Sequence, residues 1–104
     1  MDFELRTIPG CPHTVPGRDL FSQALALEGA GHATVSVKEV STDDQAEALE
    51  FHGSPTFCAG GVDLFASNAA PAVTCRVYPT PAGLAGLPTL DSLRQAVRAA
   101  IKAS

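Results

Sequence analysis

Apolar and polar positions alternate at the start of the chain as they do in a half-buried strand. Phe3 and Leu5 are separated by polar residues, a period of two that directs one face toward a core. This pattern predicts a strand over Asp2–Thr7. Pro9 and Gly10 then end it, because both residues favour turns.

The apolar period then changes from two to between three and four, as in an amphipathic helix. The apolar positions that recur at this spacing are Leu20, Phe21, Ala24, Leu25 and Leu27. We expect this helix to begin near Pro16, because proline suits the first turn of a helix. Gly29 and Gly31 provide its end.

A second strand and a second helix follow. Val35 and Val37 alternate with polar residues, which predicts a strand over 33–40. Thr42 precedes an acidic stretch and predicts a helix N-cap, with the helix running to about Phe51. The first strand, the first helix and the second strand together predict a right-handed crossover between two parallel strands.

The remaining elements are two strands and a helix. Pro55 opens a short strand that ends at Ala59, since a proline is tolerated at the first position of a strand. The stretch 60–71 is predicted as a loop, Val73–Tyr78 as a further strand and 80–88 as a second loop. Thr89 caps the last helix. The predicted order is βαβαββα in a single domain, 1–104, with the last two strands antiparallel.

Composition excludes several function classes. The net charge of the 104 residues is -4 and the basic residues do not cluster, which argues against a nucleic-acid partner. No apolar run reaches the ~20 residues of a membrane span. The acidic start of the chain does not resemble a signal peptide, so we expect a cytoplasmic protein. Three cysteines, an odd number, favour free thiols over a disulfide framework.

Cys11 is the strongest candidate for chemistry. It lies between the first predicted strand and the following helix, where free N–H groups and the positive end of the helix dipole can stabilise a thiolate. Thr14 stands where a Cys-x-x-Cys motif would have its second cysteine. Pro16 delays the helix and moves its dipole away from the thiol. Cys11 is therefore either a reactive thiol or an ordinary loop cysteine.

The element order, Gly10-Cys11-Pro12 and Gly53-Ser54-Pro55-Thr56 together resemble the thioredoxin superfamily. More narrowly, the chain resembles small bacterial thioredoxin-like proteins that are loosely labelled alkylmercury-lyase-like. The resemblance implies a thioredoxin-like α/β fold, with a central four-stranded mixed sheet flanked by helices.

The same resemblance implies where a substrate would bind. Pro55 corresponds to a cis-proline that lies against the active-site cysteine, and the residues just before it offer backbone groups to a thiol-containing peptide. The alternative is a trans proline at the start of an edge strand. The substrate-binding residues that follow from the resemblance are Pro12, His13, Thr14, Ser54, Pro55 and Thr56. His13 beside Cys11 either influences its protonation or is simply solvated.

The other two cysteines have different expectations. Cys75 shares a predicted strand face with Val73 and Val77, which favours a core position. The alternative is a catalytic role in which Cys75 resolves Cys11, provided that the Cα atoms lie within ~7 Å. Cys58 is expected in the core. No cysteine–histidine spacing is typical of zinc, so we expect neither a metal nor a cofactor.

Three functions of different classes remain open, and the sequence does not decide whether the chain is an enzyme. The first is a one-cysteine thiol–disulfide oxidoreductase with Cys11 as nucleophile, whose partner is glutathione or a protein thiol or disulfide. The second is a binder of a soft metal or an organomercurial through Cys11, with or without Cys75. The third is a non-catalytic interaction module, monomeric or homodimeric, that uses the 60–71 loop.

Overall fold

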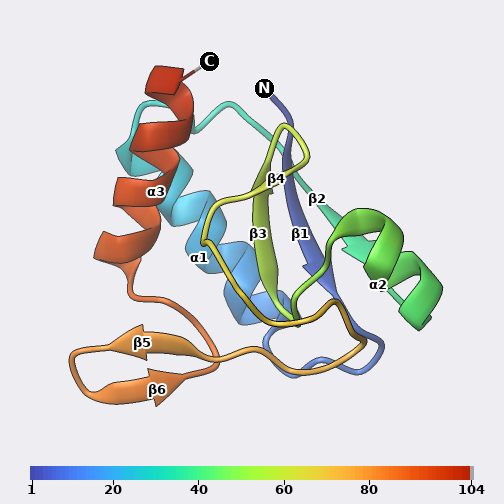
Figure 1. Ribbon diagram of the computed structural model, residues 1–104. Coiled ribbons are helices and arrows are strands. Elements are labelled where there is room, and N and C mark those ends of the chain that lie inside the picture. Colours follow the sequence, from blue (N-terminus) through green and yellow to red (C-terminus); the bar gives the residue numbers. More distant parts are fainter. Residues whose placement is uncertain (104) are drawn as a thin grey trace.

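The computed structural model describes residues 1–103 as a mixed α/β fold (Figure 1). Its elements, in chain order, are β1 (Phe3–Thr7), α1 (Thr14–Leu27), β2 (Val35–Glu39), α2 (Asp43–Leu49), β3 (Thr56–Ala59), β4 (Val62–Asp63), β5 (Tyr78–Thr80), β6 (Gly83–Ala85) and α3 (Leu90–Ala103). No helix within the described part of the chain is long and apolar enough to cross a membrane.

The main sheet has four strands in the order β2-β1-β3-β4. β1 and β2 are parallel, whereas β3 is antiparallel to both β1 and β4. Leu5 at the centre of β1 lies between Val37 of β2 and Phe57 of β3. The predicted four-stranded mixed sheet and the parallel crossover are thus confirmed.

The main core lies between the sheet and the two long helices. α1 and α3 cover one side of the sheet, and α2 lies on the other (Figure 1). Phe57 of β3 makes edge-to-face ring contacts with Phe21 of α1, at 5.3 Å between centroids, and with Tyr78 of β5, at 5.9 Å. Leu93 and Val97 of α3 complete this buried cluster. The apolar residues that alternate along β1 and those that recur at helical spacing on α1 and α3 therefore pack into one core.

A second, smaller cluster joins α2 to the rest of the molecule. Val40, Ala46 and Phe51 are fully buried there. Thr42 is the N-cap of α2, and its side chain accepts a hydrogen bond from the backbone N–H of Gln45 at 3.1 Å. The predicted cap is confirmed.

α1 begins at Thr14, two residues before the predicted start at Pro16. Pro16 is tolerated there because the first N–H groups of a helix have no intrahelical acceptor. The backbone N–H of Gly17, one residue later, bonds to the carbonyl of His13 at 2.8 Å. The proline therefore interrupts no bond of the helix.

The fourth strand of the sheet was predicted at the wrong place. The segment 73–77 is no sheet strand, and its single β-bridge joins Cys75 to Ser54. The sheet is completed instead by β4, within the predicted loop 60–71. Gly60 and Gly61 both have positive φ, which forms a two-residue turn and returns the chain directly along β3. Because β4 occupies the free edge of β3, a more distant segment cannot pair there.

The predicted loop 80–88 is also more ordered than expected. β5 and β6 form an antiparallel hairpin that projects from the body of the molecule (Figure 1). Gly83, with φ +115°, supplies the conformation that its turn requires. The exposed Leu84 lies on this hairpin.

Candidate functional site

The Cys11 loop joins the end of β1 to the start of α1. The backbone N–H of Cys11 bonds to the carbonyl of Ile8 at 3.2 Å, and the Cys11 carbonyl accepts from the N–H of Thr14 at 3.3 Å. These two bonds make successive tight turns. Cys11 is a half-buried free thiol three residues before the first helical residue.

The N-terminus of α1 is not neutralised by its own side chains. Its N-cap, His13, makes no side-chain capping bond, and the first turn contains no acidic residue. The positive end of the helix dipole therefore faces the Cys11 loop without a nearby carboxylate of that helix, although its influence fades within about one turn.

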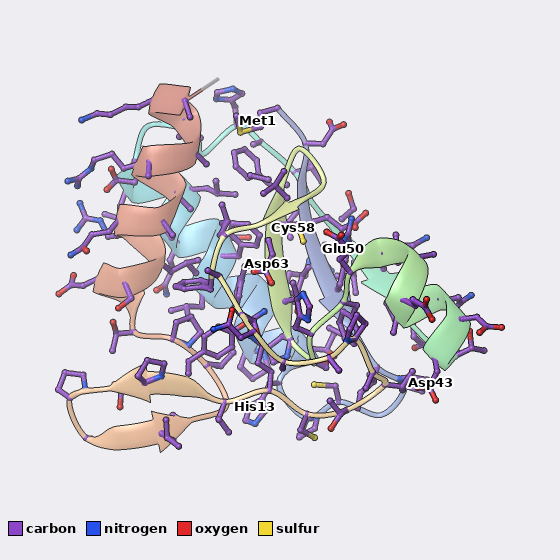
Figure 2. All side chains as sticks on the ribbon, viewed as in Figure 1. Met1, His13, Asp43, Glu50, Cys58 and Asp63 are labelled. Carbon is purple, nitrogen blue, oxygen red and sulfur yellow. The ribbon has the colours of Figure 1, made fainter. Side chains whose placement is uncertain are left out.

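His13 is packed against the backbone that follows β6. A Cβ atom placed on Gly86 would clash with Nε2 of His13, so the ring contacts the Gly86 backbone directly. Figure 2 shows His13 between the start of α1 and the base of the β5–β6 hairpin. The ring is therefore half-buried rather than simply solvated. Pro12, beside it, is exposed, whereas Thr14 is half-buried.

Ser54 connects the two segments that carry accessible cysteines. Its Oγ accepts a hydrogen bond from the backbone N–H of Ile8 at 3.1 Å, at the base of the Cys11 loop. Its own N–H donates to the carbonyl of Thr74 at 2.9 Å, and its carbonyl accepts from the N–H of Arg76 at 3.0 Å. Cys75 is the bridge partner of Ser54 in this parallel pairing.

The Ser54–Pro55 peptide bond is cis, in agreement with the expectation from sequence. Ser54, Pro55 and Thr56 are almost completely buried. The Pro55 carbonyl accepts a hydrogen bond from the Tyr78 hydroxyl, and the Thr56 hydroxyl donates to the Gly53 carbonyl. The polar groups expected to meet a substrate are thus bonded within the chain itself.

Gly53 allows this close approach. Its φ is +119°, and a Cβ atom there would lie 2.7 Å from Cβ of Arg76. An L-residue would meet both an unfavourable backbone conformation and a steric clash. Segments 51–56 and 72–78 can lie side by side because this position has no side chain.

Cys75 is exposed, contrary to the favoured expectation of a core position. That expectation assumed a sheet strand over Val73–Tyr78, whereas the segment runs along the surface beside Ser54. Cys58 is fully buried in β3, as expected. Burial raises the pKa of the Cys58 thiol to about 11, which leaves it protonated and unreactive near neutral pH.

Arg76 fixes the segment that carries Cys75. Its guanidinium forms an ion pair with Asp63 of β4 at 2.8 Å and donates to the Phe65 carbonyl at 2.7 Å. The guanidinium carbon also lies 4.8 Å from the ring centroid of Tyr78. Tyr78 is buried, which raises the pKa of its hydroxyl, so this group remains a hydrogen-bond donor.

A pocket of about 540 Å³ lies beside Cys75. Its walls include His52, Phe65, Ala69, Cys75, Arg76 and Tyr78. His52 also lines a neighbouring pocket of about 280 Å³. His52 is a residue of this wall that the sequence does not identify as a site residue. The sequence signal for this placement is the neighbouring Gly53. The close approach of Arg76 requires a glycine there, and His52 directly precedes it.

The 60–71 loop, proposed from sequence as a contact surface, is divided in the structure. Leu64 and Phe65 pack against the main core, whereas Val62 on the edge strand β4 is 67% exposed. Only part of this loop is therefore available to a partner.

Within residues 1–103, no group of three or more His, Cys, Asp and Glu side chains is arranged to hold a metal ion. Comparison of the chain with protein-family models, with curated proteins and with solved structures finds no match.

Proposed function

We propose that this chain is a thioredoxin-like thiol protein that catalyses thiol–disulfide exchange with Cys11 as the nucleophile. The observation that carries the proposal is the position of Ser54 between the two segments with accessible thiols. Its side chain holds the base of the Cys11 loop, and its backbone pairs with the segment of Cys75. The two segments are thereby attached to one buried residue.

The fold supports the same interpretation. Cys11 follows the first strand of a parallel crossover and precedes α1, and Pro55 precedes β3, which is antiparallel to β1. These are the positions that the thioredoxin resemblance implies. The first turn of α1 contains no acidic residue, so no carboxylate of that turn would repel an anionic disulfide substrate at the Cys11 loop.

The proposed reaction needs an external thiol to complete the exchange and restore the Cys11 thiol. The Cys11 thiolate attacks one sulfur of a disulfide, so that a new S–S bond forms and the other half of the substrate leaves as a thiolate. Cys75 then attacks the Cys11 sulfur and expels the remaining half as a thiolate, or glutathione attacks the other sulfur, so that the remaining half leaves as a mixed disulfide with glutathione and the Cys11 thiolate is restored. Where Cys75 is the attacking thiol, a further dithiol or two glutathione molecules must reduce the Cys11–Cys75 disulfide.

The test uses a chain in which Cys11 is the only thiol, made by Cys58→Ala and Cys75→Ser. Oxidised glutathione is added, and formation of the mixed disulfide is followed by mass spectrometry in buffer and in urea. We expect Cys11 to react faster in the folded chain, because only folding places it beside the helix N-terminus. An equal or lower rate in the folded chain would reject the proposal, and a Cys11→Ser chain measures the background.

A further inference from the structure

The pocket of about 540 Å³ is an unassigned feature with a thiol in its wall. Cys75 lines this pocket and is exposed, whereas Cys58 is buried in the sheet. A volume of this size lies in the range that small-molecule sites occupy. A ligand in the pocket would therefore lie beside an accessible thiol.

The wall that carries Cys75 is held from both ends. The N–H of Ala72 bonds to the carbonyl of Phe51 at 3.2 Å, and Ser54 pairs with the residues on either side of Cys75. Tyr78 closes the segment through its bond to the Pro55 carbonyl. This wall is thus firmly attached, whereas another part of the lining comes from the segment 66–69, which has no regular secondary structure.

The chemistry of the wall favours an uncharged, largely apolar ligand. Leu64, Phe65, Val77 and Pro79 contribute apolar surface. Among the residues described as lining the pocket, Arg76 alone carries a full charge, and Asp63 neutralises it at 2.8 Å. A charged ligand would lose hydration without gaining a free partner.

His52 contributes a partly buried ring to the same wall. Its Nδ1 is the one buried side-chain nitrogen or oxygen without a hydrogen-bond partner among the described residues, and His52 belongs to the same wall. This nitrogen has almost no accessible surface, so a ligand in the pocket would meet the exposed part of the His52 ring rather than this atom.

Ser54, the bridge partner of Cys75, does not itself line the pocket. Its N–H and carbonyl already bond to Thr74 and Arg76, so an extended peptide finds no free backbone pair at this residue. A compact molecule that enters the pocket needs no such pairing.

From these features we infer that the pocket beside Cys75 binds a low-molecular-weight, uncharged disulfide with an apolar body. The Cys75 thiolate attacks one sulfur, the substrate S–S bond breaks, one half leaves as a thiolate and the other remains joined to Cys75 within the pocket. This inference goes beyond the proposed exchange at Cys11 and does not depend on it.

The test uses the Cys11→Ser chain, in which Cys75 is the accessible thiol. Dithiodipyridine, an uncharged aromatic disulfide, is added over a range of concentrations, and release of pyridinethione is followed by absorbance. We expect the rate to reach a plateau, because binding in the pocket precedes exchange. N-acetylcysteine provides the reference for a thiol without a pocket, and its rate rises linearly with concentration.

Two matched variants locate the binding. Ala69 lines the pocket, whereas the adjacent Ala70 does not, and both are exposed. We expect Ala69→Trp to slow the reaction at low concentration by roughly tenfold, because the indole occupies the volume in which the aromatic ring would be buried. Ala70→Trp should leave the rate unchanged.

The charged probe dithiobis(nitrobenzoate) completes the experiment. Relative to N-acetylcysteine, it should react with Cys75 more slowly than dithiodipyridine does and without a plateau. A linear concentration dependence for dithiodipyridine, or equal effects of the two tryptophan variants, would overturn the inference. Neither result would bear on Cys11, which is absent from this chain.

Discussion

Single residues decide how closely the two cysteine-bearing segments approach. At Gly53 the absence of a side chain lets Arg76 lie directly alongside, and at Gly86 it lets the His13 ring rest on the backbone. Neither contact can be predicted from the sequence, because each joins residues more than 20 positions apart. The sequence nevertheless identifies Cys11 and Pro55, since both lie next to local turn signals.

Gly53 provides a prediction with a matched control. Gly53→Ala should lower the free energy of unfolding by about 1–3 kcal/mol more than Gly83→Ala. Both residues have similar positive φ, +119° and +115°, but a Cβ atom at Gly83 meets no atom within 4 Å. Urea unfolding of the two variants measures the difference. Equal destabilisation would mean that the Arg76 contact relaxes without cost.

At the scale of elements, sequence patterns predicted correctly those helices and strands whose formation depends mainly on neighbouring residues. β1, β3, the Thr42 cap and the last helix are of this kind. The strand expected over Val73–Tyr78 failed because alternation indicates an extended segment but does not identify its pairing partner. The Gly60–Gly61 pair is a local hairpin signal, and it is stronger evidence for the partner of β3 than the alternation over Val73–Tyr78.

The junction of α1 with α3 is an element-scale feature that depends on pH. Glu28, at the end of α1, bonds to Arg94 at 2.9 Å and to Arg98 at 2.7 Å, both on α3. The bonds from Arg98 and Arg94 lower the pKa of the Glu28 carboxyl from 4.5 to about 2. Because the folded pKa is below the unfolded one, this stabilisation is present above pH 4.5 and is lost as pH falls toward 2.

Glu28→Gln should therefore lower the melting temperature near neutral pH and have progressively less effect as the pH falls below 4.5. Thermal unfolding of both chains over this pH range measures the difference. Glu47→Gln, at an exposed position of α2, is the control and should show little effect. A pH-independent difference between the wild-type and Glu28→Gln chains would exclude an electrostatic origin.

At the scale of the whole molecule, one aromatic cluster joins the sheet, α1 and the β5–β6 hairpin. Phe57 contacts the rings of Phe21, Phe65 and Tyr78, and its own side chain is fully buried. The sequence indicated that Phe57 lies on a strand, but not that residues from three other segments converge on it. Such convergence depends on tertiary packing, which the spacing of apolar residues along the sequence does not specify.

Phe57→Ala should cost about 3–5 kcal/mol of unfolding free energy, a large share of the roughly 5–15 kcal/mol typical of a domain. Phe57→Leu, which leaves a smaller void, should cost less. Denaturant unfolding of both variants tests this order. A loss for Phe57→Ala no larger than that for Phe57→Leu would show that the surrounding rings collapse into the space.

The bonds around Ser54 have a consequence for hydrogen exchange. The amide hydrogens of Ile8, Ser54 and Arg76 are all held by bonds to or from this single residue. Any local opening that frees Ser54 releases all three together, although they come from three distant parts of the chain. Their exchange with solvent then becomes one cooperative event, and its rate reports how often the Cys11 loop and the Cys75 segment separate.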